Sequence, residues 1–227
     1  LFMEYGARIR TIEPFGIRFA AVASYSVADY GIMLTTKDVA KNSDFFTLEN
    51  LENSGVNLKI ACKSQSNFNE LRDKENGLSN FAIALVGVRE ENYNLVFAAR
   101  AFAKVKYCNG DTKTIYSDFS ADNCRSIYDV AKVGLEKDEL NRELYRKYCD
   151  GVIDIKIEGE TPSLLYSSNL YTVELLKEGG QLTITLKSNT TDFKVSSIKC
   201  ITINGERIVG FTYNGGKIQI DITEFLS

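Results

Sequence analysis

The first half of the chain consists largely of short runs in which apolar and polar side chains alternate, a pattern typical of β-strands. A turn composition at Glu13-Pro14-Phe15-Gly16 separates the first two runs, so a hairpin is predicted there. A short helix is predicted after Thr36, because this threonine or a neighbour can cap its start. The strands predicted from alternation are residues 8–12, 17–22, 30–34 and 56–62.

Residues 81–88 and 95–106 are almost entirely apolar, which is typical of strands buried on both faces. Asn109-Gly110 is a strong hairpin signal, so residues 112–116 are predicted as the return strand. These three segments are expected to be adjacent antiparallel strands of one sheet.

Helical spacing occurs first in residues 64–76, where Phe68 and Leu71 fall on one face of a polar segment that ends at Gly77. This pattern predicts a helix.

A second helical region begins after Ser126 and runs to Asp150-Gly151. Ser126 with Asp129 resembles a capping box, which marks the start of this region. Gly134 and the charged residues 136–139 are expected to divide it into two helices.

After Gly151 the pattern becomes purely β, with strands predicted at residues 152–158, 171–175, 181–187 and 218–222. Three turn signals lie between or near them: Gly179-Gly180, Asn204-Gly205 and Asn214-Gly215-Gly216. Such spacing is typical of a small sandwich, and an immunoglobulin-like (Ig-like) β-sandwich is predicted.

The predicted fold class is therefore mainly β with helical inserts (α+β). Residues 1–135 are expected to form an antiparallel β domain with flanking helices, and residues 136–150 a helical connector. Residues 151–227 are expected to form the Ig-like β-sandwich.

The chain contains no histidine, which excludes intrachain Ser/His/Asp and Cys/His catalysis and histidine-bearing zinc sites. Its net charge of -3 gives no broad attraction for polyanions, so no nucleic-acid partner is expected. No apolar run of the sequence, Phe19 to Ala23 among them, is long enough to cross a bilayer. The five cysteines include no C-x-x-C pair, so no metal or cofactor is expected.

Two arginines lie within apolar strand segments: Arg18 between Ile17 and Phe19, and Arg100 between Ala99 and Ala101. A buried guanidinium requires acceptors, because an unpaired buried charge is strongly destabilising. Internal pairing is the favoured interpretation, with a carbonyl or with one of the carboxylates Asp29, Glu91 and Asp118. The alternative is a pocket in which the guanidinium forks bind a carboxylate or phosphate.

Several tyrosines lie near the ends of predicted strands, where loops assemble binding sites. They are either half-buried sheet residues or a sugar-binding strip. The ligand-binding candidates are Arg18, Arg100, Tyr30, Tyr93 and Tyr116, with no catalytic residue among them. The carboxylate pairs Glu90-Glu91 and Asp118 with Asp122 are nominal candidates for glycoside hydrolysis, since spacing along the chain does not give their separation in space.

A set of short motifs resembles a recurrent, uncharacterised module of exported cell-surface proteins of Gram-positive, clostridia-type bacteria. The resemblance covers about residues 4–135, within the usual size of a domain. The motifs are Gly6-Ala7-Arg8-Ile9-Arg10, Phe15-Gly16-Ile17-Arg18-Phe19, Tyr30-Gly31, Asn92-Tyr93-Asn94, Ala98-Ala99-Arg100-Ala101, Tyr116-Ser117 and Arg125-Ser126-Ile127-Tyr128-Asp129-Val130-Ala131.

This resemblance implies an extracellular or cell-surface location beside Ig-like or repeat domains. The start at Leu1-Phe2-Met3 is typical of a segment of a longer precursor, so export signals are expected outside it. The expected function is a non-catalytic binding or spacer module, monomeric, with a polysaccharide or a host or cell-wall protein as partner. A carboxylate-dependent carbohydrate-active enzyme or accessory domain is the alternative.

Overall fold

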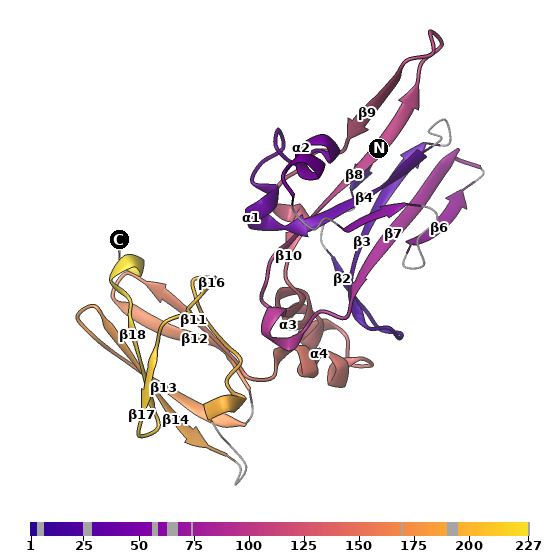
Figure 1. The fold of residues 1–227 in the computed structure, drawn as a ribbon. Coiled ribbons are helices and arrows are strands. Elements are labelled where there is room, and N and C mark those ends of the chain that lie inside the picture. Colours follow the sequence, from indigo (N-terminus) through magenta and orange to yellow (C-terminus); the bar gives the residue numbers. More distant parts are fainter. Residues whose placement is uncertain are drawn as a thin grey trace. The chain divides into compact units, whose positions relative to one another are not determined.

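The computed structural model describes residues 1–3, 7–24, 29–55, 59–62, 68–73, 75–168, 170–189 and 195–226. Within these ranges the chain is mostly β, with several antiparallel sheets and few helices, as the sequence predicts (Figure 1). It divides into two compact units, Leu1–Tyr145 and Arg146–Ser227, called here the N-terminal and C-terminal units. Each unit has a hydrophobic core of its own.

The N-terminal unit contains two five-stranded sheets. In sheet 1, β3 and β7 are the central strands, and in sheet 2, β4 and β8 are central. Sheet 1 consists of β1 (Phe2–Met3), β2 (Arg8–Arg10), β3 (Gly16–Ser24), β6 (Phe68–Asp73) and β7 (Leu78–Val86). Sheet 2 consists of β4 (Asp29–Thr36), β5 (Lys59–Cys62), β8 (Phe97–Lys106), β9 (Thr112–Tyr116) and β10 (Cys124–Arg125).

Two predicted hairpins are confirmed: β2 pairs with β3 across the turn at Pro14, and β8 pairs with β9 across Asn109-Gly110. The prediction that β7, β8 and β9 are adjacent strands is wrong, because β7 belongs to sheet 1. The connection from β7 to β8, which contains the 3-10 turn η1 (Glu90–Asn92), crosses from one sheet to the other. A continuous apolar run shows that a strand is buried but not which sheet contains it.

The inner faces of the two sheets pack against each other. On β4, Tyr30 contacts the Phe81 ring of β7 at 4.7 Å between centroids, and its hydroxyl is 2.8 Å from the Ser79 hydroxyl. Cross-strand pairing of Tyr30 with Ala103 places the β8 alanines Ala99, Ala101 and Ala103 on this same inner face, where all are fully buried. Small side chains on β8 beside large aromatic ones allow the two layers to interdigitate.

The opposite face of sheet 2 is covered by α1 (Lys37–Ala40) and α2 (Leu48–Asn53). Met33, Ala98 and Phe102 from the sheet belong to the same core cluster as Ala40, Phe46 and Leu51. Thr36 is the N-cap residue of α1, as predicted, but its side chain makes no capping hydrogen bond.

The helix predicted over residues 64–76 is wrong where the structure describes it, because β6 is a strand paired antiparallel with β7. β6 is an edge strand of sheet 1, and Leu71 is 72% exposed. An edge strand tolerates polar residues at most positions, so strict alternation of apolar and polar residues is lost. The remaining apolar residues, Phe68 and Leu71, have the spacing of one face of a helix. Residues 56–58 of the preceding predicted strand, and residues 64–67 and 74 of this predicted helix, lie outside the described residues.

The second helical region is divided as predicted, into α3 (Ile127–Lys137) and α4 (Arg142–Cys149). The Ser126 hydroxyl caps α3, because it accepts a hydrogen bond from the Asp129 amide at 3.0 Å. In the turn between the helices, the Asp138 carboxylate accepts hydrogen bonds from the Asn141 side chain at 2.9 Å and from the Tyr145 hydroxyl at 2.8 Å. These bonds lower the pKa of Asp138, and burial together with Asp138 raises the pKa of Tyr145 to about 12.

Replacing Asp138 with asparagine is expected to reduce the loss of stability at acid pH. Because the pKa of Asp138 is lowered on folding, the ionised carboxylate stabilises the folded state. This stabilisation is complete above the unfolded pKa of about 3.9 and is lost as the pH falls through the lower folded pKa. Urea denaturation of wild type and Asp138→Asn between pH 7 and pH 2 measures this difference. The control is Glu136→Gln, which removes an exposed carboxylate of α3. The assignment would be contradicted if the free energy of unfolding changed equally with pH in wild type and in Asp138→Asn.

The C-terminal unit contains two four-stranded sheets that share one core. The three predicted glycine turns are confirmed as hairpins, whereas β12 was not predicted. The first sheet consists of β12 (Thr161–Ser167), β11 (Val152–Glu158), β15 (Cys200–Ile203) and β16 (Glu206–Arg207). The second consists of β13 (Tyr171–Glu178), β14 (Gln181–Ser188), β18 (Lys217–Asp221) and β17 (Thr212–Asn214).

Leu182, Ile184 and Leu186 face the core of this unit, as their alternation predicts. One pairing, β11 with β15, is parallel. The constant-type immunoglobulin domain has seven strands in two antiparallel sheets, so the strand order here differs from that arrangement. In neither unit do the described residues include a helix that is both long and apolar enough to cross a membrane.

Candidate functional site

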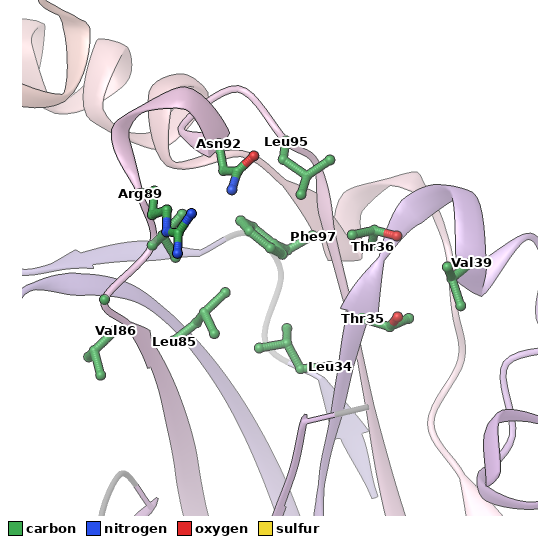
Figure 2. Close-up of a pocket in the computed structure, with 12 residues that line it drawn as sticks. Leu34, Thr35, Thr36, Val39, Leu85, Val86, Arg89, Asn92, Leu95 and Phe97 are labelled. Atoms are coloured by element: carbon green, nitrogen blue, oxygen red, sulfur yellow. The ribbon is translucent and has the colours of Figure 1, made fainter. Parts of the chain in front are cut away.

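A pocket of about 820 Å³ lies in the N-terminal unit where β4 and β7 end and β8 begins (Figure 2). Sheets 1 and 2 both contribute to it, because β7 belongs to sheet 1 and β4 and β8 belong to sheet 2. The pocket is lined by Leu34, Thr35, Thr36, Val39, Leu85, Val86, Gly87, Val88, Arg89, Asn92, Leu95 and Phe97.

The floor of the pocket is apolar and is part of the unit's interior. Leu34 is 2% exposed and Phe97 is 8% exposed. Phe97 pairs directly with Thr36 in the antiparallel pairing of β8 with β4. Leu34 lies two positions before Thr36 on β4, so all three side chains lie on the same face of sheet 2. Leu85 of β7 completes the floor from sheet 1.

The rim of the pocket carries hydrogen-bonding groups on two sides. Figure 2 shows Arg89 and Asn92 on one side of the Phe97 ring, and Thr36 on the other. The side chains of Asn92 and Thr36 make no hydrogen bond within the described part of the chain. Arg89 is highly exposed and lies 3.8 Å from Glu91. An ion pair this long and exposed contributes little, so the guanidinium is available to a ligand.

The described lining residues include no aspartate or glutamate. Glu90 and Glu91 lie in the adjacent turn, where Glu91 contacts Arg89, and Asp122 contacts Arg125 at 3.7 Å. The pocket lining therefore does not supply the two facing carboxylates that glycoside hydrolysis requires. Within the described ranges, no cluster of cysteine and carboxylate side chains is arranged to hold a metal ion.

Arg100, one of the predicted ligand-binding residues, makes its hydrogen bonds inside the N-terminal unit. Its Nε donates to the Ser117 carbonyl at 2.8 Å, and its Nη1 donates to the carbonyls of Ser43 at 2.5 Å and Phe46 at 2.8 Å. The side chain is 9% exposed, and burial lowers the pKa of Arg100 against the opposing effect of Tyr116. The guanidinium thus connects β8 to the loop that precedes α2.

The predicted tyrosines lie in three different places. Tyr116 is beside Arg100, with the guanidinium carbon 5.0 Å from the ring centroid, and its hydroxyl accepts a hydrogen bond from the Leu48 amide at 3.1 Å. Tyr30 is 1% exposed between the sheets. Tyr93 follows η1 and is half-buried, and burial together with Glu90 raises its pKa.

Arg18, the remaining candidate, lies on the outer face of sheet 1, opposite Arg8 of β2. The structure therefore brings together Arg100 and Tyr116 but not the full set of five. The pocket was not predicted from the sequence. The sequence feature that indicates it is a polar connection, residues 87–96, between two apolar strands.

No protein family model and no curated protein matches this chain. The fold and the pocket define the class only as a two-unit, β-rich protein with a candidate small-ligand site in its N-terminal unit.

Proposed function

We propose that the N-terminal unit is a non-catalytic glycan-binding module of an exported bacterial surface protein. The observation that carries the proposal is the pocket of about 820 Å³, which combines an apolar floor with a polar rim. In this proposal the pocket holds one sugar residue of the glycan, while the rest of the chain of sugars extends over the surface.

Glycan is favoured over protein because of the shape of the site. Pockets that bind small ligands typically enclose about 300–1,000 Å³. Protein partners instead need broad surfaces, about 800 Å² on each side of a standard interface. A compact hollow with an apolar base therefore suits a single sugar unit better than a protein surface.

A sugar with an acetamido substituent matches the chemistry of this pocket. Its methyl group would contact Leu34, Leu85 and the Phe97 ring. Its amide and hydroxyl groups would exchange hydrogen bonds with Asn92 and Thr36, both of which lack side-chain partners within the described residues. Polar groups that a bound ligand covers require such partners, which gives the site its selectivity.

The cellular context rests on the resemblance to Gram-positive surface modules. In this proposal the chain is a monomer outside the cell. The C-terminal unit is an Ig-like spacer in the broad sense, since proteins with this sandwich architecture do not all share one strand order.

The binding experiment uses isothermal titration calorimetry with a linear tetramer of N-acetylglucosamine. Cellotetraose, which has the same backbone linkage without acetamido groups, is the matched ligand control. Val88→Phe is expected to fill part of the pocket and weaken tetramer binding by about tenfold or more, which corresponds to about 1.4 kcal/mol. Val133→Phe, on an exposed position of α3, is expected to leave binding unchanged.

Absence of tetramer binding to wild type would contradict the proposal, as would equal binding to both valine variants. Binding of short apolar peptides at the same site in place of sugar would indicate a protein partner. The enzyme alternative predicts cleavage of the tetramer during the titration, which mass spectrometry of the recovered ligand detects.

A further inference from the structure

The outer face of sheet 1 carries three neighbouring arginines, Arg8, Arg10 and Arg18, called here the arginine triad. Arg8 of β2 is directly opposite Arg18 of β3 in the antiparallel register. Their neighbours Ile9 and Ile17 are buried, at 7% and 0% exposure, so strand alternation places the arginines on the opposite, outer face.

The three side chains start close together. Directly opposed residues in an antiparallel pair have Cβ atoms about 4.5–5.5 Å apart. Arg10 follows Arg8 by two positions on the same strand, a rise of roughly 6.5 Å. Three guanidinium groups can therefore reach a single small ligand.

No carboxylate neutralises the arginine triad within the described residues. Arg10 donates a hydrogen bond to the Pro14 carbonyl, and neither Arg8 nor Arg18 forms an ion pair with another described residue. Glu13, in the turn between β2 and β3, makes no ion pair with them, and Asp129 of the neighbouring α3 instead accepts a hydrogen bond from Ser126.

This arrangement is unfavourable for the free protein, because like charges directly opposite each other on a sheet are destabilising. It also contrasts with the net charge of -3 of the whole chain. A concentrated positive patch on an acidic protein gives a local attraction for an anion that the overall charge does not provide.

We propose that the arginine triad is a second binding site, which takes a phosphate group. A planar carboxylate presents two oxygens, which one guanidinium fork can satisfy. A phosphate presents three acceptor oxygens and about -1.5 to -2 charges at pH 7, which matches three forks. The triad lies on the outer face of sheet 1 whereas the pocket lies between the sheets, so the two sites can be tested separately.

The test is calorimetric titration of the full chain with inorganic tripolyphosphate, a linear array of phosphates, at constant ionic strength. Wild type is expected to bind, and the triple variant Arg8→Gln, Arg10→Gln, Arg18→Gln is expected to lose binding. The control variant Lys104→Gln, Lys106→Gln, Lys113→Gln changes the charge equally on the β8–β9 hairpin and is expected to bind as wild type does.

Arg18→Lys keeps the charge but removes the fork, and is expected to weaken binding by about tenfold, equal to about 1.4 kcal/mol. This single change keeps the test valid if the triple variant fails to fold. Failure of wild type to bind tripolyphosphate would overturn the proposal, as would loss of binding in the lysine control. Citrate binding as tight as tripolyphosphate would also overturn it, because the site would then select carboxylates. None of these results depends on sugar binding in the pocket.

Discussion

Replacement of Arg100 with methionine is expected to destabilise the N-terminal unit by about 2–6 kcal/mol. Methionine approximates the length of the arginine stem but donates no hydrogen bonds. The carbonyls of Ser117 and Phe46, which accept at 2.8 Å in buried surroundings, would lose their donor. Each buried acceptor left without a partner costs about 1–3 kcal/mol, and lost contact with the Tyr116 ring adds to the effect.

Native-state hydrogen exchange of the β4 and β8 amides measures this change in the N-terminal unit alone. The matched control is Arg142→Met, since the guanidinium of Arg142 is partly exposed and lies 3.5 Å from Glu139. Surface ion pairs contribute about 0–1 kcal/mol, so the control should stay close to wild type. If Arg100→Met exchanged as slowly as wild type, the three carbonyl bonds would not stabilise the fold.

Gly16→Ala is expected to cost about 2–3 kcal/mol and to distort the pocket. A Cβ atom at this position would lie 2.0 Å from the Leu85 carbonyl oxygen, which belongs to the backbone of the paired strand β7. The clash can be relieved only by separating β3 from β7 at this end. Leu85 and Val86 line the pocket, so the substitution links a packing defect to the binding site.

Thermal denaturation followed by circular dichroism, together with tetramer binding, measures both consequences. The control is Gly210→Ala, because a Cβ atom there would meet nothing within 4 Å. A Gly16→Ala protein with the stability and affinity of wild type would show that β3 and β7 are not paired in this register.

Local patterns predicted the hairpins and the helix break because these features depend on a few adjacent residues. Asn109-Gly110 and the glycine turns of the C-terminal unit determine chain reversal directly. The assignment of β7 to sheet 1 could not be predicted in the same way, because it depends on contacts such as Tyr30 with Phe81, far apart in the sequence. The prediction for the edge strand β6 was wrong for a related reason. Its residues have helical spacing, but pairing with β7 makes the segment a strand.

The sequence predicted less of the candidate site than of the fold. Arg100 was recognised as unusual, and the favoured interpretation of internal pairing with a carbonyl agrees with its hydrogen bonds. The apolar floor of the pocket, by contrast, consists of leucine and phenylalanine residues that have the same pattern as the core. These residues are open to a ligand only because β4 and β7 end, in the folded protein, beside the start of β8.

The most direct measurement is the set of intermolecular nuclear Overhauser effects between the N-acetylglucosamine tetramer and protein labelled at its leucine and valine methyl groups. Leu34, Leu85, Leu95, Val39, Val86 and Val88 all line the pocket and carry such methyls. Effects are expected between the acetamido methyl of the sugar and the methyl groups of Leu34 and Leu85. Effects confined to methyls outside this group, or none at saturating ligand, would contradict the proposal that the pocket binds glycan.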